Sequence, residues 1–179
     1  MGLIKNWIYR LRGEVSTEVL VSRGLKVGRN FQRLNHVLID DSHPWLIEIG
    51  DDVTFAPNVH VLAHDASTKQ FTGYTRISPV KIGNRVFVGS GSIILPGVTV
   101  GDDVVIGAGS VVTSDIPSGS VAYGTPAVVK MSLEEFISKE KANIASSKVY
   151  GDDYVFDYIT EEKKEEQKND LKGKTGYIV

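Results

Sequence analysis

The side chains best suited to acid–base chemistry in this chain are four histidines, His36, His43, His60 and His64. A histidine exchanges protons near neutral pH, so each is a candidate general base. His64 follows the segment APNVHVLA, where a repeat in the sequence is interrupted. We expect His60 to face solvent or an interface, and His36 and His43 to lie in an irregular part of the chain. His64 is therefore the strongest candidate.

The chain contains no cysteine. This excludes a disulfide framework, a thiolate zinc site and a cysteine nucleophile. The first twelve residues, MGLIKNWIYRLR, carry basic residues among the apolar ones, so they form neither a signal-peptide core nor a membrane span. Both features predict a cytoplasmic protein.

Length, composition and charge favour one ordinary globular domain. The chain has 179 residues, of which 41% are hydrophobic and only 8% aromatic, so aliphatic side chains must fill the core. The formal net charge is -2 and the central region has no basic block. A nucleic-acid partner is therefore not expected.

A six-residue period organises the middle of the chain. Written in sixes from Ile82, the sequence reads IGNRVF, VGSGSI, ILPGVT, VGDDVV, IGAGSV and VTSDIP. Each hexad begins with Ile or Val, most have glycine second, and the fifth position is small or β-branched. Three such hexads make one turn of a parallel β-helix, with the leading side chains stacked inward. The second-position glycine is expected where the backbone bends tightly or takes a positive φ.

The same period occurs upstream, with two interruptions. IGDDVT, FAPNVH and a hexad opening at Val61 keep the register, and VGRNFQ from Val27 follows it more loosely. We expect an extruded loop over residues 63–79. A second break lies between Val27 and Ile49, where we expect LNHVLIDDSHPWLIE (residues 34–48) to form an irregular coil. An antiparallel sandwich is the alternative, but alternation alone would not fix glycine and aliphatic residues at a period of six.

Three regions are expected. Residues 1–24 are expected to form a helical cap with an apolar face, and we favour this cap over a membrane-surface anchor. Residues 25–130 are expected to form the β-helix. Residues 131–179 are expected to form a helical, charged extension. Ser132 and Glu135 make a capping-box pattern that opens a helix. From Thr160, acidic and basic residues alternate, and Glu161 to Lys164 and Glu165 to Lys168 are spaced for ion pairs on a solvated helix, which we favour over an interaction tail.

The segments IGDDVTFAPNVHVLAHD and KIGNRVFVGSGSIILPGVTVGDDVVIGAGSVVTSDIPSGSVAYGTPAVV resemble the hexapeptide-repeat, or left-handed β-helix, acyltransferase family. The match runs from about Val27 to Met131 and is similar to the galactoside, maltose and polysaccharide O-acetyltransferases in particular. The resemblance implies a left-handed coil and a homotrimer with active sites between subunits. It also implies transfer of an acetyl group from acetyl-CoA to a saccharide hydroxyl, with a surface-polysaccharide precursor as a candidate acceptor.

On the acceptor side, the resemblance implies that His64 is the general base. Asp40 matches the position of an acidic residue that contacts the acceptor sugar in relatives, although SHPWL beside it reads as an insertion. His43, Asp65 and Tyr74 are expected to complete the acceptor pocket. Transfer would proceed by direct attack of the acceptor hydroxyl on the thioester.

On the donor side, the resemblance implies that the backbone N–H of Ser90 binds the oxyanion. Relatives often carry an arginine where this chain has Val128, so a CoA phosphate contact is expected to move to Lys130. The expected cofactor-binding residues are Ser90, Gly91, Ala108, Thr113, Gly124 and Lys130.

Two other functions remain open from the sequence. A γ-type zinc carbonic anhydrase would need three histidines that converge between subunits, which His43, His60 and His64 would have to supply. A trimeric β-helix could also serve as a non-catalytic scaffold. We favour the transferase, for which no metal is expected and the membrane is not a favoured partner.

Overall fold

The computed structural model describes residues 14–179, so the expected apolar helix face near the N-terminus lies outside the described residues. The chain divides into two compact units, of which the first ends at Leu133 and the second is Glu134–Val179. Within the described part of the first unit, α2 (Thr17–Ser22) precedes the strands. The hydroxyl of Ser16 caps this helix by accepting a hydrogen bond from the N–H of Val19. No helix among the described residues is long and apolar enough to cross a membrane.

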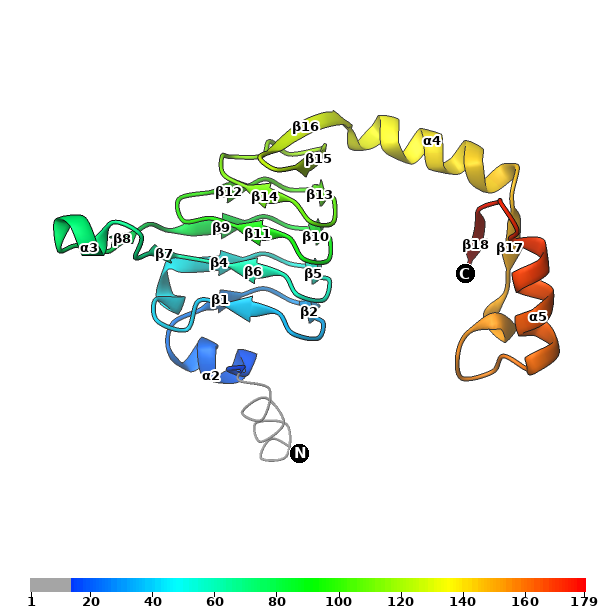
Figure 1. Cartoon of the computed structure of the whole chain (residues 1–179), viewed down its shortest axis with the longest axis horizontal. Coiled ribbons are helices and arrows are strands. Elements are labelled where there is room, and N and C mark those ends of the chain that lie inside the picture. The colour runs from blue at the N-terminus through cyan, green and yellow to red at the C-terminus, as the bar shows by residue number, and fades with distance from the viewer. Residues whose placement is uncertain (1–13) are drawn as a thin grey trace. The chain divides into compact units, whose positions relative to one another are not determined.

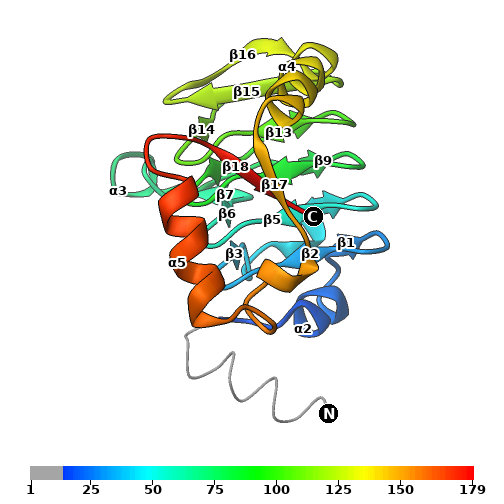
Figure 2. The same cartoon turned by 90° about the vertical axis from the view of Figure 1, so that its right-hand side faces the viewer.

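In the described part of the first unit, short strands stack in successive coils (Figure 1). Each strand pairs in parallel with the strand above or below it, and the pairs form three sheets, one on each face of the coil. Sheet A contains β1 (Lys26–Val27), β4 (Ile47–Ile49), β9 (Val80–Ile82) and β12 (Thr99–Val100). Sheet B contains β2 (Gln32–Arg33), β5 (Thr54–Phe55), β10 (Phe87–Val88), β13 (Val105–Ile106), β15 (Ser120–Gly124) and the antiparallel β16 (Ala127–Ser132). Sheet C contains β3 (Leu38–Ile39), β6 (His60–Val61), β11 (Ile93–Ile94) and β14 (Val111–Val112). The turned view shows the coils one above another (Figure 2).

The hexad columns form the core, as the sequence predicts. The six leading residues from Ile82 to Val112 are each at most 1% exposed. The fifth-position column is buried as well, including the hydroxyls of Ser92 and Ser110, which both donate to the carbonyl of Gly107. Burial of the two columns explains why the period tolerates only small or β-branched side chains there.

The second-position glycines serve a different purpose from the one expected. Gly83 does not have a positive φ; a Cβ added there would lie 2.7 Å from the carbonyl carbon of Gly101 in the next coil. Left-handed backbone occurs instead at the fourth position of the hexads, where Asn, Asp and Gly predominate. The fourth-position residues with a positive φ are Asn30, His36, Asp52, Asn58, Arg85, Gly91, Gly97, Asp103 and Gly109. Glycine in second position therefore permits close stacking of coils.

The early part of the coil is more regular than expected. Gln32–Arg33 and Leu38–Ile39 pair in parallel with the strands of the next coil, so the period continues to Ile39. Only residues 40–46 interrupt it, and they include the short 3-10 helix η1 (Pro44–Leu46). The predicted irregular coil over residues 34–48 was therefore too broad, because the regular coil continues to Ile39.

The second interruption follows β6. There β7 (His64–Asp65) pairs antiparallel with β8 (Arg76–Ile77), and α3 (Lys69–Thr72) lies between them. Figure 1 shows α3 and β8 to one side of the stacked strands. Because Ser78 N–H donates to the carbonyl of Ala63, the two ends of this segment are held together where it joins the coil.

The second unit contains most of α4 (Leu133–Ala145), followed by β17 (Lys148–Tyr150), η2 (Asp152–Tyr154), α5 (Glu161–Asp170) and β18 (Gly176–Ile178). Strands β17 and β18 pair in parallel around the buried ring of Tyr150. The ion pairs expected in the tail are present, with N–O distances of 2.6 Å for Glu161 to Lys164 and for Glu165 to Lys168.

Candidate functional site

His64 and Asp40 meet at the edge between sheets C and A. Ile39 of β3 lies beside Val61 of β6, which places the residues that follow these strands next to each other. The Nδ1 atom of His64 lies 2.5 Å from Oδ2 of Asp40. Because the carboxylate accepts the Nδ1 proton, Nε2 keeps the lone pair that a general base needs.

The carboxylate of Asp40 is enclosed, with no exposed side-chain surface. Its Oδ2 also accepts from the N–H of Ala63, and its Oδ1 accepts from the N–H groups of Ser42 and His43. Burial raises the pKa of Asp40, but the hydrogen bonds from His64, Ala63 and Ser42 lower it more, so the net pKa lies below its usual value. A carboxylate in this position holds His64 and has no surface for a sugar, which differs from the expected acceptor contact.

A groove with a volume of about 520 Å³ opens beside His64. One wall consists of the segment between β6 and β9 and the other of coil residues. The lining residues are Leu62, His64, Asp65, Ser67, Arg76, Ser78, Leu95, Pro96 and Thr113. The groove therefore brings together three of the expected site residues, His64, Asp65 and Thr113.

Asp65 is held within this groove by an ion pair that the sequence analysis missed. Its Oδ2 lies 2.6 Å from Nη2 of Arg76, and its Oδ1 accepts from the N–H of Ser67. Hydrogen bonds from Ser67, together with Arg76, lower the pKa of Asp65 to about 2. Tyr74, by contrast, is 78% exposed and does not line the groove.

Leu95 and Pro96 were also missed, although the sequence carried a signal for them. Leu95 and Thr113 occupy second positions of their hexads, where the other hexads from Ile82 onward have glycine. Both residues lie on the edge that faces His64. A departure from glycine at this position therefore marks the edge where coils carry side chains for the groove.

His43 lies behind His64, in the short insertion after β3. The ring centroids of His43 and His64 are 5.5 Å apart. The ring centroids of His43 and Trp45 are 5.3 Å apart. Nδ1 of His43 is buried and has no hydrogen-bond partner among the described residues. His43 does not line the groove itself, so its place is next to His64.

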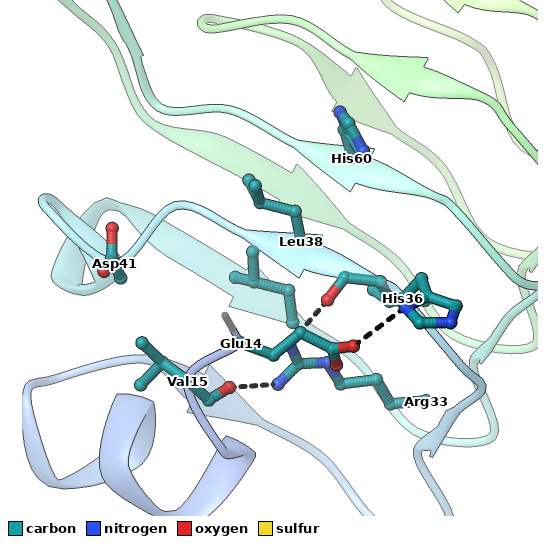
Figure 3. Close-up of a pocket in the computed structure, with 9 residues that line it drawn as sticks. Glu14, Val15, Arg33, His36, Leu38, Asp41 and His60 are labelled. Atoms are coloured by element: carbon teal, nitrogen blue, oxygen red, sulfur yellow. Dashed lines mark hydrogen bonds and ion pairs between the residues drawn. The ribbon is translucent and has the colours of Figure 1, made fainter. Parts of the chain in front are cut away.

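His36 and His60 line a separate depression of about 260 Å³ (Figure 3). Nδ1 of His36 lies 3.3 Å from Oε1 of Glu14. In the same depression, the guanidinium of Arg33 donates a hydrogen bond to the carbonyl of Val15. His60 is therefore not grouped with His43 and His64 among the described residues of one chain.

The other expected cofactor residues lie on the edge between sheets B and C. The N–H of Gly109 donates to the carbonyl of Ser90, and the hydroxyl of Ser90 donates to the carbonyl of Pro57, so these corners form one column. The N–H of Gly124 donates a hydrogen bond to the hydroxyl of Ser110, which follows Gly109 in this column. Ser90, Gly91, Ala108 and Gly124 are thus separated from His64 by the width of sheet C.

Lys130 lies on β16 above this second edge. The β15–β16 register shifts by one residue, pairing Val121 with Met131 and Ala122 with Val129, so Lys130 is the extra residue of a β-bulge. Its Nζ lies 5.4 Å from the ring centroid of Tyr123. The bulge keeps the lysine on the exposed face of the hairpin.

Comparison with known proteins gives consistent relationships. Residues 79–114 match a family model described as the hexapeptide repeat of succinyl-transferase. The chain is 36% identical over 162 residues to Protein CapG of Staphylococcus aureus, covering 82% of this chain and 92% of that protein. It is 43% identical over 112 residues to the galactoside O-acetyltransferase of Escherichia coli (strain K12), covering 59% of this chain and 52% of that enzyme.

Solved structures agree with these relatives. A maltose O-acetyltransferase from Clostridium difficile 630 has 46% identity and a TM-score of 0.56, covering 61% of this chain and 59% of that one. A galactoside acetyltransferase in complex with coenzyme A has 38% identity and a TM-score of 0.58, covering 64% of this chain and 58% of that one. The chain therefore spans about half to three-fifths of the length of these three O-acetyltransferases, and nearly all of CapG.

Proposed function

Because the chain belongs to the hexapeptide-repeat acyltransferase family, we propose that it transfers an acetyl group from acetyl-CoA to a saccharide hydroxyl. The observation that carries this proposal is the His64–Asp40 pair at the mouth of the groove. The saccharide class is supported by the relatives, which include galactoside and maltose O-acetyltransferases.

In the proposed reaction, Nε2 of His64 takes the proton of the acceptor hydroxyl as its oxygen attacks the thioester carbonyl. Asp40 keeps the imidazole oriented and offsets the positive charge that develops on the ring. Collapse of the tetrahedral intermediate expels the thiolate of CoA, and His64 returns the proton to that sulfur. Asp65 and Arg76 hold the wall of the groove across β7 and β8.

The donor half of the site comes from a neighbouring subunit in this proposal. His64 and Thr113 lie on one edge of sheet C, whereas Ser90, Ala108 and Gly124 lie on its other edge. In a cyclic trimer, one edge of each chain faces the opposite edge of the next. The N–H of Ser90 has no protein acceptor among the described residues, so it is available to the oxyanion.

Family membership also implies a left-handed coil, from which residues 63–79 extend toward the neighbouring subunit. In this proposal the small residues along the second edge leave room for the pantetheine arm. Lys130, whose Nζ lies 5.4 Å from the ring centroid of Tyr123, is the proposed contact for a CoA phosphate. The groove and the second edge together would then bind both substrates.

The test is acetyl transfer from acetyl-CoA to a panel of saccharides, with products identified by mass spectrometry. His64→Ala is expected to lower kcat by about 10²- to 10⁴-fold, the usual contribution of a general base. His36→Ala is the matched control, since His36 lies in the other depression. Equal rates for the wild type and His64→Ala would contradict the assignment. Absence of turnover with every acceptor would favour a non-catalytic scaffold.

A further inference from the structure

Three metal-ligating groups converge behind the groove. Asp40, His43 and His64 each offer one ligand atom, and these atoms lie within 4.8 Å of one another. We propose that this cluster binds a divalent ion of the zinc type and that the bound ion inhibits acetyl transfer. The inhibition rests on the proposed function, whereas the binding does not.

The position of His43 supports a ligand in this cluster. Its backbone N–H donates to Oδ1 of Asp40, which fixes the start of the insertion against the carboxylate. Pro44 is buried directly after it, and the ring centroid of Trp45 lies 5.3 Å from that of the imidazole at an interplanar angle of 57°. Nδ1 of His43 is nevertheless left without a partner among the described residues. Buried polar atoms without partners are uncommon, and an unseen ion is one explanation for such an atom.

The ligand set indicates the class of ion. Two imidazoles and one carboxylate suit Zn²⁺, which commonly takes three protein ligands and leaves a fourth position for water. Mg²⁺ and Ca²⁺ prefer oxygen ligands and larger coordination numbers. The cluster is therefore expected to select Zn²⁺ over Mg²⁺.

Coordination of the ion by either ring nitrogen of His64 would inhibit acetyl transfer. A neutral imidazole has one lone pair and one N–H. If Nε2 coordinates the ion, the lone pair needed by the base is used. If Nδ1 coordinates the ion, the single ring proton moves from Nδ1 to Nε2. In both arrangements Nε2 cannot accept the proton of an acceptor hydroxyl.

The binding test uses the full chain, freed of metal by dialysis against a chelator, and titrates it calorimetrically with ZnCl₂ and separately with MgCl₂. One Zn²⁺ per chain is expected, with no measurable Mg²⁺ binding. His43→Gln should weaken Zn²⁺ binding at least about 10-fold, and His60→Gln, the matched control from the other depression, should leave it unchanged. Circular dichroism and melting curves establish that both variants are folded.

Two results would overturn the site: no Zn²⁺ binding by the wild type, or equal affinities of the wild type and His43→Gln. Equal weakening by His60→Gln would indicate adventitious binding to surface histidines and would also overturn it. In the second arm, Zn²⁺ should inhibit acetyl transfer by the wild type, a chelator should restore it, and His43→Gln should need at least about 10-fold more Zn²⁺ for the same inhibition. Binding that depends on His43 but does not inhibit would overturn the inhibitory part alone. Binding without any acetyl transfer would count against the proposed function and leave the metal site intact.

Discussion

Nδ1 of His64 lies 2.5 Å from Oδ2 of Asp40, whose side chain has no exposed surface. The two residues are 24 positions apart and meet because β3 and β6 stack in adjacent coils. Asp40 also accepts hydrogen bonds from three backbone N–H groups, so its carboxylate is held by contacts that do not depend on the imidazole. The pair therefore presents Nε2 of His64 to the groove in one orientation.

Replacing Asp40 by Asn should lower kcat by about 10²- to 10⁴-fold, because an amide offers only one acceptor oxygen to four N–H groups and no longer selects the required tautomer of His64. Steady-state kinetics should show little change in KM for acetyl-CoA, because Asp40 acts through His64. A parallel rise in KM and loss of secondary structure would indicate a general folding defect instead.

The hydrogen bonds that Asp65 accepts from Ser67, together with its ion pair to Arg76, should make the groove segment sensitive to acid. The pKa of Asp65 is lowered from its usual 3.8 to about 2 in the folded chain. A depressed carboxylate pKa adds stability above the unfolded value, and this stability is lost as pH falls from about 4 toward 2. Melting curves should therefore give Asp65→Asn a lower Tm than the wild type at pH 6. The difference in Tm should shrink as the pH approaches 2. A difference that is constant across this range would exclude these contacts as its cause.

The hexad columns were predictable from the sequence because one period fixes both the inward side chains and the stacking of coils. Ile82, Ile94 and Ile106 are buried as that period requires. The partnership of Asp40 with His64 was not predicted, because the insertion at residues 40–46 concealed that Ile39 still keeps the register. The role of second-position glycine was also missed, since a close approach between coils depends on the stacking distance and leaves no local signature.

Two glycine substitutions should separate close stacking from backbone conformation. Gly83→Ala places a Cβ 2.7 Å from the carbonyl carbon of Gly101, and should lower the free energy of unfolding by about 3 kcal/mol or more. Gly109→Ala meets no atom within 4 Å and suffers only from its φ of +67°, so about 1–2 kcal/mol is expected. Urea denaturation at one protein concentration measures both. Equal losses would contradict the stacking explanation.

Lys130→Ala should raise KM for acetyl-CoA a few-fold at low salt and leave kcat unchanged, because an exposed ion pair contributes about 1 kcal/mol or less. Added salt should reduce the difference, since screening weakens the same contact in the wild type. Lys81→Ala, on the outer face of sheet A, is the control. A KM for Lys130→Ala equal to that of the wild type would place the phosphate contact elsewhere.

Sites shared between subunits should allow two inactive variants to restore one another. His64→Ala removes the base from one edge of a chain, and Ala108→Trp fills the opposite edge, where Ala108 is exposed. Each homotrimer should be inactive in the acetyl-transfer assay. When the two chains are co-expressed in equal amounts and assemble at random, about one interface in four joins two intact edges, so about a quarter of wild-type activity should return. Mixing the separately assembled trimers without subunit exchange is the control and should restore nothing. If the base and the CoA edge acted within one chain, every chain in the mixed trimers would remain defective, and co-expression would recover no activity.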